Sequence, residues 1–234
     1  MNFEALKERL FPMLVTGDRV GARAIVNEAV ESGTSAEELT HECYWPMLDM
    51  INLMYREDKM ASLAHHYATR LLRSLVDQAQ ANYEQKPTRE RSIMMFCGAT
   101  EVDDLAAQMV ADLAEADGYS VSFGGGGVSW DEIMAEVHTR TPDVLLLFSS
   151  AASDAPHIRI LIDSIRDIQA CPNMQIAVGG GVFNRAEGLA AEIGADLWAT
   201  TPRELVHSLN TQADRRATPD QRTVGRHRGD AMAA

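Results

Sequence analysis

Positive charge is scarce in this sequence. Its 234 residues carry 21 Lys and Arg against 34 Asp and Glu, which gives a formal net charge of −13 and a pI near 4.9. A protein that binds nucleic acid needs a basic surface against the phosphates, so we expect no nucleic acid to bind the folded part of the chain. Only the segment from Gln212 onward is rich in arginine. Such a basic tail either solubilises the protein or docks on an acidic partner or on phosphate.

Long apolar runs and cysteines are also few. No run approaches the roughly 20 residues of a membrane-spanning helix, and the N-terminal MNFEALKERL has no apolar signal core. The three cysteines, Cys43, Cys97 and Cys171, lack the spacing of metal ligands. We therefore expect a cytoplasmic protein with reduced thiols and no membrane contact.

The first part of the chain, residues 1–85, has the hydrophobic period of helices. Apolar residues recur at helical spacing, as at Leu6, Leu10 and Leu14, and short connections separate four such segments. Four helices with short connections predict a four-helix bundle, with a kink at Pro46. The polar segment 86–90 is then the linker to a second domain.

After this linker, strand-like and helix-like segments alternate five times. Strands are predicted at 92–97, 119–124, 143–149, 174–178 and 196–200, and helices at 101–116, 130–139, 155–169, 184–193 and 202–210. The continuous apolar run Val144–Phe148 is typical of a strand that is covered on both faces. The pattern predicts an α/β domain at 91–210 with five parallel strands in a flavodoxin-like (Rossmann-like) order, followed by a disordered tail at 211–234.

Four glycines follow the second predicted strand, at the edge where open α/β sheets bind their ligands. Gly124, Gly125, Gly126 and Gly127 would let a flat ring or a ligand tail lie against bare backbone. The alternative is a flexible loop that contacts no ligand. Because four consecutive glycines exceed what a turn needs, we favour close approach of a ligand.

A helical cap followed by a flavodoxin-like domain resembles the cobalamin (B12)-binding modules of methionine synthases, corrinoid methyl carriers and B12-dependent photoreceptors. The resemblance covers roughly residues 10–207 and rests on four motifs, Leu14–Arg19, Pro46–Tyr55, Ile176–Gly181 and Glu192–Asp196. It implies that a cobalamin, adenosyl- or methylcobalamin, is held between the cap and the sheet. It also implies cofactor contacts at the strand ends, from Ser149, Ser150, Gly179, Gly180, Gly181 and Thr200. The two serines are equally well explained as turn formers.

One family motif is not present. Members that displace the cofactor's own base carry Asp-x-His-x-x-Gly after the first strand, and its histidine ligates cobalt from below. The aligned residues here are Glu101, Asp103 and Ala106, and Thr100–Asp103 has the pattern of a capping box. Asp103 therefore stays a candidate cofactor contact, as a helix-cap carboxylate rather than a ligand of cobalt, which prefers nitrogen donors.

The cap carries a second family signature in altered form. Light-responsive members place Trp, nine residues and then Glu-His over the upper face of the corrin. The same spacing here gives Tyr55, His65 and His66. The resemblance implies that all three approach the cofactor and that His66 is a candidate upper cobalt ligand. The alternative is that His66 is a solvated surface residue.

The resemblance is closest to stand-alone B12-dependent photoreceptors and antirepressors, since no DNA-binding segment precedes the cap. It implies a sensory or regulatory binding module, rather than an enzyme, that acts through a regulatory protein partner or through self-association. One alternative is a corrinoid methyl carrier, which the loss of the lower histidine and its acidic surroundings disfavours. Another is the same scaffold with haem or a bilin, since His65 and His66 could ligate haem, or with no cofactor.

Overall fold

The computed structural model of the protein describes residues 1–169, 171–218 and 221. The chain divides into two compact units. Unit 1 comprises Met1–Arg89 and Thr100–Tyr119, and unit 2 comprises Glu90–Ala99 and the chain from Ser120 onward. Within the described residues, no helix combines the length and the apolar character that a membrane span needs.

Unit 1 is helical, as its hydrophobic period predicts. Its elements are α1 (Phe3–Thr16), α2 (Arg19–Glu31), α3 (Ala36–Leu39), the π-helical turn η1 (Thr40–Tyr44), α4 (Trp45–Arg56), α5 (Ser62–Gln80) and α6 (Glu101–Ala116). Local signals set several of the helix ends. Gly17 ends α1 with a φ of 72°, Asp18 caps α2, and Ser35 and Glu38 form the capping box of α3.

The kink that Pro46 predicts takes the form of the π-helical turn. Pro46 lies in the first turn of α4, and η1 immediately precedes it, so that α3, η1 and α4 run on as one helical stretch. A proline has no N–H for the helical ladder and crowds the preceding turn. A wider turn of i→i+5 bonds relieves that crowding, and the N–H of Trp45 donates to the carbonyl of Thr40.

The polar segment before β1 is fixed to the end of α6. Lys86 Nζ lies 2.5 Å and Arg89 Nη2 lies 2.8 Å from the carboxylate of Asp117, whose side chain is 6% exposed. Gly118 has a φ of 96°, and a Cβ there would lie 2.2 Å from the carbonyl oxygen of Pro87. The two ion pairs hold the segment 86–89 against the end of α6, and the absence of a side chain at Gly118 lets the backbone of Pro87 approach it.

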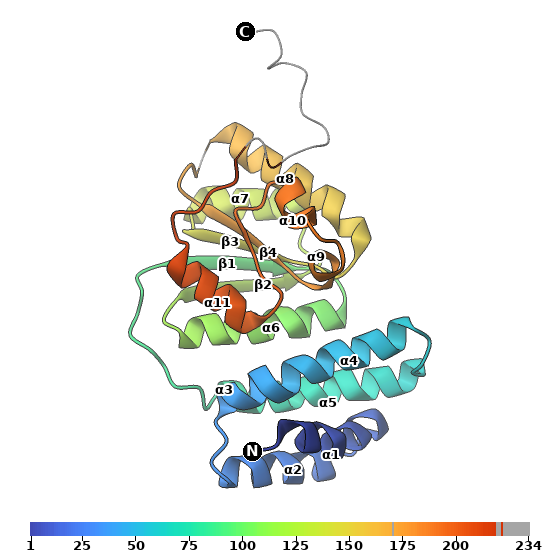
Figure 1. Cartoon of the computed structure of the whole chain (residues 1–234). Coiled ribbons are helices and arrows are strands. Elements are labelled where there is room, and N and C mark those ends of the chain that lie inside the picture. The colour runs from blue at the N-terminus through green and yellow to red at the C-terminus, as the bar shows by residue number, and fades with distance from the viewer. Residues whose placement is uncertain (170, 219–220, 222–234) are drawn as a thin grey trace. The chain divides into compact units, whose positions relative to one another are not determined.

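Unit 2 contains one sheet of five parallel strands, which confirms the predicted flavodoxin-like fold (Figure 1). The strands are β1 (Ser92–Cys97), β2 (Ser120–Gly126), β3 (Val144–Phe148), β4 (Gln175–Gly179) and β5 (Leu197–Trp198). Their order is β2-β1-β3-β4-β5. The helical elements are α7 (Trp130–Arg140), the 3₁₀ turn η2 (Ala152–Asp154), α8 (Ala155–Ile168), α9 (Gly181–Arg185), α10 (Leu189–Glu192) and α11 (Pro202–Thr211).

One face of this sheet forms a continuous apolar core with α7, α8, α9 and α10, and Figure 1 shows α7 and α8 on the same side of the strands. Alternate residues of the strands point into it, such as Phe96 on β1, Leu147 on β3 and Val178 on β4. Ile133 and Ile162 face them from α7 and α8. The apolar residues that recur every second position in the strands and every three to four positions in the helices thus pack into one core.

Two predicted elements differ in the structure. The single helix predicted at 184–193 is wrong, because Gly180 and Gly188, with φ values of 104° and 80°, divide the region into two short helices. The fifth strand is shorter than predicted and holds only Leu197–Trp198. The chain leaves the sheet early because the N–H of Thr200 donates to Glu204 in the first turn of α11.

The tail is also different over the part that the structure describes. Residues 212–218, predicted to begin a disordered segment, hydrogen-bond to β4 and to the residue before β5. Buried polar groups of the sheet hold this stretch, and no apolar periodicity signals it. The remainder of the predicted tail, residues 219–220 and 222–234, lies outside the described residues, apart from Gln221.

Candidate functional site

The order of the strands reverses between β1 and β3, because β2 lies on one side of β1 while β3, β4 and β5 follow on the other. A crevice forms outside the carboxyl ends of the strands at such a switch point. A cavity of about 160 Å³ lies there in unit 2. Its lining comes from the ends of β1 and β3 and the starts of α7 and α8, namely Phe96, Cys97, Gly98, Ala99, Gly127, Val128, Trp130, Ile133, Leu147, Phe148, Ser149, Asp154 and Ile158.

The cavity has apolar walls and one polar side. The Ser149 hydroxyl donates to Asp154 Oδ2 at 2.6 Å and accepts from the N–H of Ala151 at 3.2 Å. The ring of Trp130 is 37% exposed and stacks with His157, with centroids 6.2 Å apart. An apolar cavity of roughly 150 Å³ accommodates one benzene ring, so this one has room for a single ring.

Most of the glycine run serves the sheet itself. Gly124–Gly126 belong to β2, where a bulge shifts the register opposite Met95 and Phe96. A Cβ would lie 2.5 Å from the Phe96 ring at Gly124, and 2.4 Å from the carbonyl oxygen of Gly98 at Gly126. The flexible-loop alternative is thus wrong for these residues, and the close approach there is to β1. Gly127, where a Cβ would meet nothing within 4 Å, leaves bare backbone at the rim of the cavity.

The predicted residues at the ends of β3 and β4 come together. Gly180 lies against Ser149, with a Cβ position 2.3 Å from the Ser149 carbonyl oxygen. The N–H of Gly181 donates to Ser150 Oγ at 3.3 Å, and Arg185 donates to the Ser150 carbonyl at 2.5 Å. Both serine hydroxyls therefore have protein partners, and the absence of side chains on the glycines lets the two strand ends touch.

Thr200 has a structural role at the end of β5. Its hydroxyl and its N–H both donate to the carboxylate of Glu204, at 2.7 and 2.8 Å. These hydrogen bonds lower the pKa of Glu204. The arrangement caps α11, so Thr200 lies at the predicted sheet edge with its hydroxyl already bonded.

In unit 1, Tyr55 and His65 form a stacked pair. Their ring centroids are 4.1 Å apart and the ring planes meet at 22°. His65 is 9% exposed, and its Nε2 is buried with no hydrogen-bond partner among the described residues. Burial, reinforced by the neighbouring His66, lowers the pKa of His65. Burial thus favours the neutral form of the imidazole, and within the described part of the chain its Nε2 is left for another donor.

His66 has a different environment from its neighbour. Its side chain is 59% exposed, and Nδ1 lies 4.0 Å from Glu101 Oε2, which is 34% exposed. Arg70 Nε lies 3.9 Å from the other oxygen of Glu101. The predicted cap residues thus gather in one place, with His65 as the buried ring and His66 as the accessible one.

α6 begins after its N-cap Thr100, and Asp103 is its third residue, so the predicted capping box is formed on one side. Asp103 is fully buried, its Oδ2 accepts from the Thr100 hydroxyl at 2.8 Å, and its N–H donates to Thr100 Oγ1 at 3.0 Å. The carboxylate bonds to the hydroxyl of Thr100 where a full capping box would use the backbone N–H. Asp103 is committed to the helix start in place of the motif histidine.

The described residues place no three His, Cys, Asp or Glu side chains where they could hold a metal ion together. Cobalamin brings its cobalt inside a corrin ring, so it needs a surface and not a chelating cluster. The bare backbone at Gly127 and the end of β4, where Gly179–Gly181 carry no side chains, offer such a surface, and the cavity beside them has room for one ring of a bound group.

Sequence reasoning missed several cavity residues. From the sequence, Cys97 is given no role beyond that of a reduced thiol, and neither Trp130 nor Asp154 is singled out. The sequence does indicate that these residues lie at the ends of elements, since Cys97 ends a predicted strand and Asp154 precedes a predicted helix. It does not indicate their convergence, because that depends on how β1 and β3 pair.

Two family models match the chain, and both are described as a B12 binding domain. One covers residues 91–206 and the other residues 6–80. The fold is similar to that of the monomethylamine corrinoid protein of Methanosarcina barkeri, with a TM-score of 0.76 and 14% identity over 87% of this chain and 96% of that one.

A second similar structure is the methanol:cobalamin methyltransferase complex MtaBC of Methanosarcina barkeri, with a TM-score of 0.50 and 14% identity over 96% of this chain and 86% of that one. Identities this low show a shared fold. No curated protein matches the chain in sequence.

Proposed function

From its membership of the cobalamin-binding module family, with cobalamin as its cofactor, we propose that this chain is a regulatory module. We further propose that it holds cobalamin without a protein ligand below the cobalt. The observation that carries the proposal is the start of α6. Thr100 and Asp103 form a buried helix cap where base-displacing relatives place their histidine. A bound cobalamin would then have to rely on its own base, because Thr100 and Asp103 carry no nitrogen in their side chains.

Residues at the carboxyl edge of the sheet are the ones we assign to cofactor binding. Gly127 offers bare backbone, and Gly179–Gly181 keep the neighbouring strand ends free of side chains. The cavity at the switch point lies beside that edge and offers mostly apolar walls. When bound, cobalamin supplies a cobalt–carbon bond that light can break. The residues of the chain hold and orient it and carry out no covalent chemistry in this proposal.

The cap residues make a sensor the better explanation than a catalyst. Stacking on Tyr55 keeps His65 in one orientation, and its low pKa keeps it neutral. His66, the next residue in α5, is exposed, and we assign it as the residue that would offer an imidazole nitrogen to a bound cobalamin. A helix that carries such a histidine changes its surroundings when the ligand state changes, and only such differential contacts can report a ligand.

Reconstitution tests this proposal directly. The protein is mixed with adenosyl-, methyl- and hydroxocobalamin, and with haem and biliverdin as controls, and each sample is passed over a size-exclusion column in darkness and after illumination. We expect the cobalamins alone to bind, and illumination of the adenosylcobalamin complex to change its elution volume. Binding of haem or biliverdin in preference to cobalamin contradicts the proposal, and so does an elution volume that light leaves unchanged.

A corrinoid methyl carrier is the second candidate, and fold similarity favours it. The monomethylamine corrinoid protein matches over nearly its whole length, and the MtaBC complex pairs such a fold with a methyltransferase. A carrier must be methylated again after each transfer. We expect this chain, once reduced and supplied with a methyl donor and a methyltransferase, to give no repeated turnover, whereas repeated turnover would make it a carrier.

A further inference from the structure

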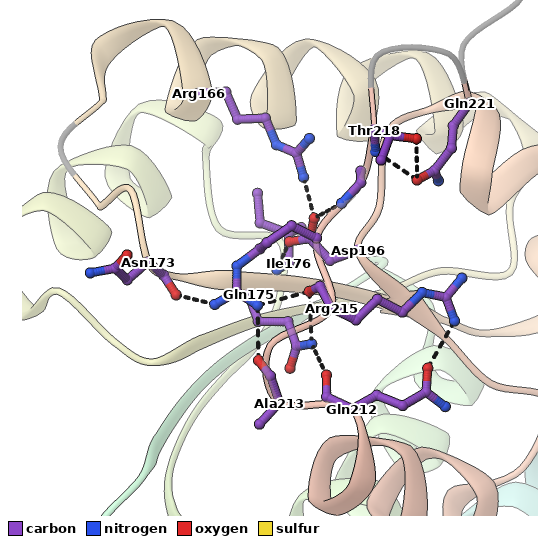
Figure 2. Close-up of polar contacts among 12 residues, drawn as sticks. Arg166, Asn173, Gln175, Ile176, Asp196, Gln212, Ala213, Arg215, Thr218 and Gln221 are labelled. Atoms are coloured by element: carbon purple, nitrogen blue, oxygen red, sulfur yellow. Dashed lines mark hydrogen bonds and ion pairs between the residues drawn. The ribbon is translucent and has the colours of Figure 1, made fainter.

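The segment after α11 lies beyond the matched family domain, which ends at residue 206. Residues 212–218 nevertheless make an ordered set of contacts with unit 2, at the amino ends of β4 and β5 (Figure 2). This is the edge of the sheet opposite the one that we assign to the cofactor. The contacts are therefore independent of the cobalamin site.

Asp196 is the central polar group of this set. It is 1% exposed and accepts hydrogen bonds from three different segments. Arg166 Nη2 of α8 donates to Oδ1 at 2.7 Å, the N–H of Ile176 in β4 donates to Oδ2 at 2.7 Å, and the N–H of Ala217 donates to Oδ1 at 2.6 Å. A buried carboxylate needs such charge-assisted partners, and one of them comes from the terminal segment.

Gln175 depends on the terminal segment more strongly. It is fully buried, and its side-chain Nε2 donates to the carbonyl oxygens of Gln212 at 2.8 Å and Arg215 at 3.2 Å. An amide nitrogen has two hydrogens to donate, so the segment accepts both. Gln175 is buried with the segment in place, and release of the segment removes both acceptors of its amide.

Two arginines complete the contact. The guanidinium of Arg215 lies over the ring of Trp198, 4.6 Å from its centroid, and Arg216 donates to the carbonyl of Asn173. A guanidinium over a tryptophan face is a favourable cation–π pair. The segment thus presents one backbone N–H, two carbonyls and two guanidiniums, each to a matching group in the rest of unit 2.

We propose that unit 2 carries a peptide-binding site, formed by Gln175, Asp196 and Trp198, which residues 212–218 of the same chain occupy. Its ligand class is an extended segment that offers an N–H to Asp196, carbonyls to Gln175 and an arginine to Trp198. The covalent link gives the resident segment a high effective concentration, so it excludes a free peptide of the same sequence. Release of the segment opens the site to a partner of that chemistry.

Ala217→Pro in the full-length chain tests the proposal, because proline has no N–H for Asp196. Ala217→Gly keeps the N–H and is the matched control. We expect amide hydrogen exchange over residues 212–218 to be at least about tenfold faster in the proline variant than in the control, as loss of a charge-assisted hydrogen bond implies. We also expect a fluorescent peptide of residues 211–221 to bind the proline variant saturably and to show no binding to the wild type.

Two further variants make the test decisive. Asp196→Asn combined with Ala217→Pro is expected to abolish peptide binding. If the proline variant does not fold, Arg215→Ala replaces it, with Arg203→Ala as the control arginine, and exchange over residues 212–218 is expected to rise about threefold. The proposal is overturned if hydrogen exchange over residues 212–218 is unchanged in Ala217→Pro or, where that variant does not fold, in Arg215→Ala. It is also overturned if exchange rises in the variant but the peptide of residues 211–221 fails to bind it.

Discussion

At the scale of single residues, Asp103 is the side chain with which a role of the start of α6 at the cobalt can be tested. It is fully buried and bonded to Thr100 at the start of α6. We predict that Asp103→Ala leaves the absorption spectrum of bound cobalamin unchanged, because the carboxylate ligates no cobalt. We also predict a loss of roughly 1 kcal/mol in the free energy of unfolding, because the variant loses the hydrogen bond from the Thr100 hydroxyl to the carboxylate and keeps the backbone cap. A changed spectrum in a folded Asp103→Ala protein would give Asp103 a role at the metal.

Asp112 on α6 should make the stability of the protein depend on pH. Burial raises its pKa to about 7, and the nearby carboxylates of Glu115 and Asp77 contribute. Because this folded-state pKa lies above the ordinary value of 3.8, the folded state binds the proton more tightly than the unfolded state. The contribution of Asp112 to the free energy of unfolding is therefore fully present below about pH 4. It decreases as the pH rises to about 7 and does not change further at higher pH.

Asparagine resembles the protonated carboxyl at every pH. We therefore predict that the change in the free energy of unfolding caused by Asp112→Asn is more favourable at pH 8 than at pH 4. The difference is on the order of 1 kcal/mol, since Asp112 remains partly exposed and solvent screens its charge. Denaturant unfolding at the two pH values measures it, with the exposed Asp49→Asn as control. Equal effects of Asp112→Asn at both pH values would show that this carboxyl titrates normally.

The two cap histidines should separate binding from signalling. We predict that His66→Ala retains cobalamin and loses the light-dependent change in elution volume, since the exposed imidazole is the one free to move to a new ligand. Tyr55→Ala should instead weaken cobalamin binding, because it removes the ring that orients His65. A His66→Ala protein with the full response to light would make His66 a surface residue.

At the scale of elements, local signals were sufficient where caps and periodicity agree. The bounds predicted for β1 and α6 are those observed, since Gly98 and the Thr100 cap separate an apolar run from a helical period. The error at 184–193 has a conformational cause. The positive φ of Gly188 divides that region, and no residue pattern distinguishes such a glycine from one tolerated within a helix.

Gly126 allows a test of the packing between two elements. A Cβ there would lie 2.4 Å from the carbonyl oxygen of Gly98, a backbone atom that cannot rotate away. We predict that Gly126→Ala destabilises the protein by about 1–3 kcal/mol, in the range of overpacked positions. Gly127→Ala, which meets no atom within 4 Å, is the control and should lose only about 1 kcal/mol for its positive φ. Equal losses in thermal unfolding would contradict a clash at Gly126.

At the scale of the whole molecule, the sequence predicts which edge of the sheet carries the candidate site residues, but it does not predict which side chains they contact. Strand ends could be predicted, and parallel strands bring Ser149, Gly180 and Thr200 to one edge of the sheet. Their partners could not be predicted, because Asp154 and Glu204 reach the hydroxyls only after folding. The same limit hid the contacts of residues 212–218, which depend on two buried polar groups and on no apolar pattern.

The most direct test of the account is the source of the axial nitrogen on cobalt. Protein labelled uniformly with ¹⁵N is loaded in darkness with unlabelled cob(II)alamin, and its electron paramagnetic resonance spectrum is recorded. We predict cobalt hyperfine lines split into triplets by ¹⁴N, because the cofactor would keep its own base if the start of α6 supplies only the oxygen-bearing side chains of Thr100 and Asp103. Doublets from ¹⁵N, which would place a protein nitrogen on the cobalt, contradict the account, and so does a failure to bind.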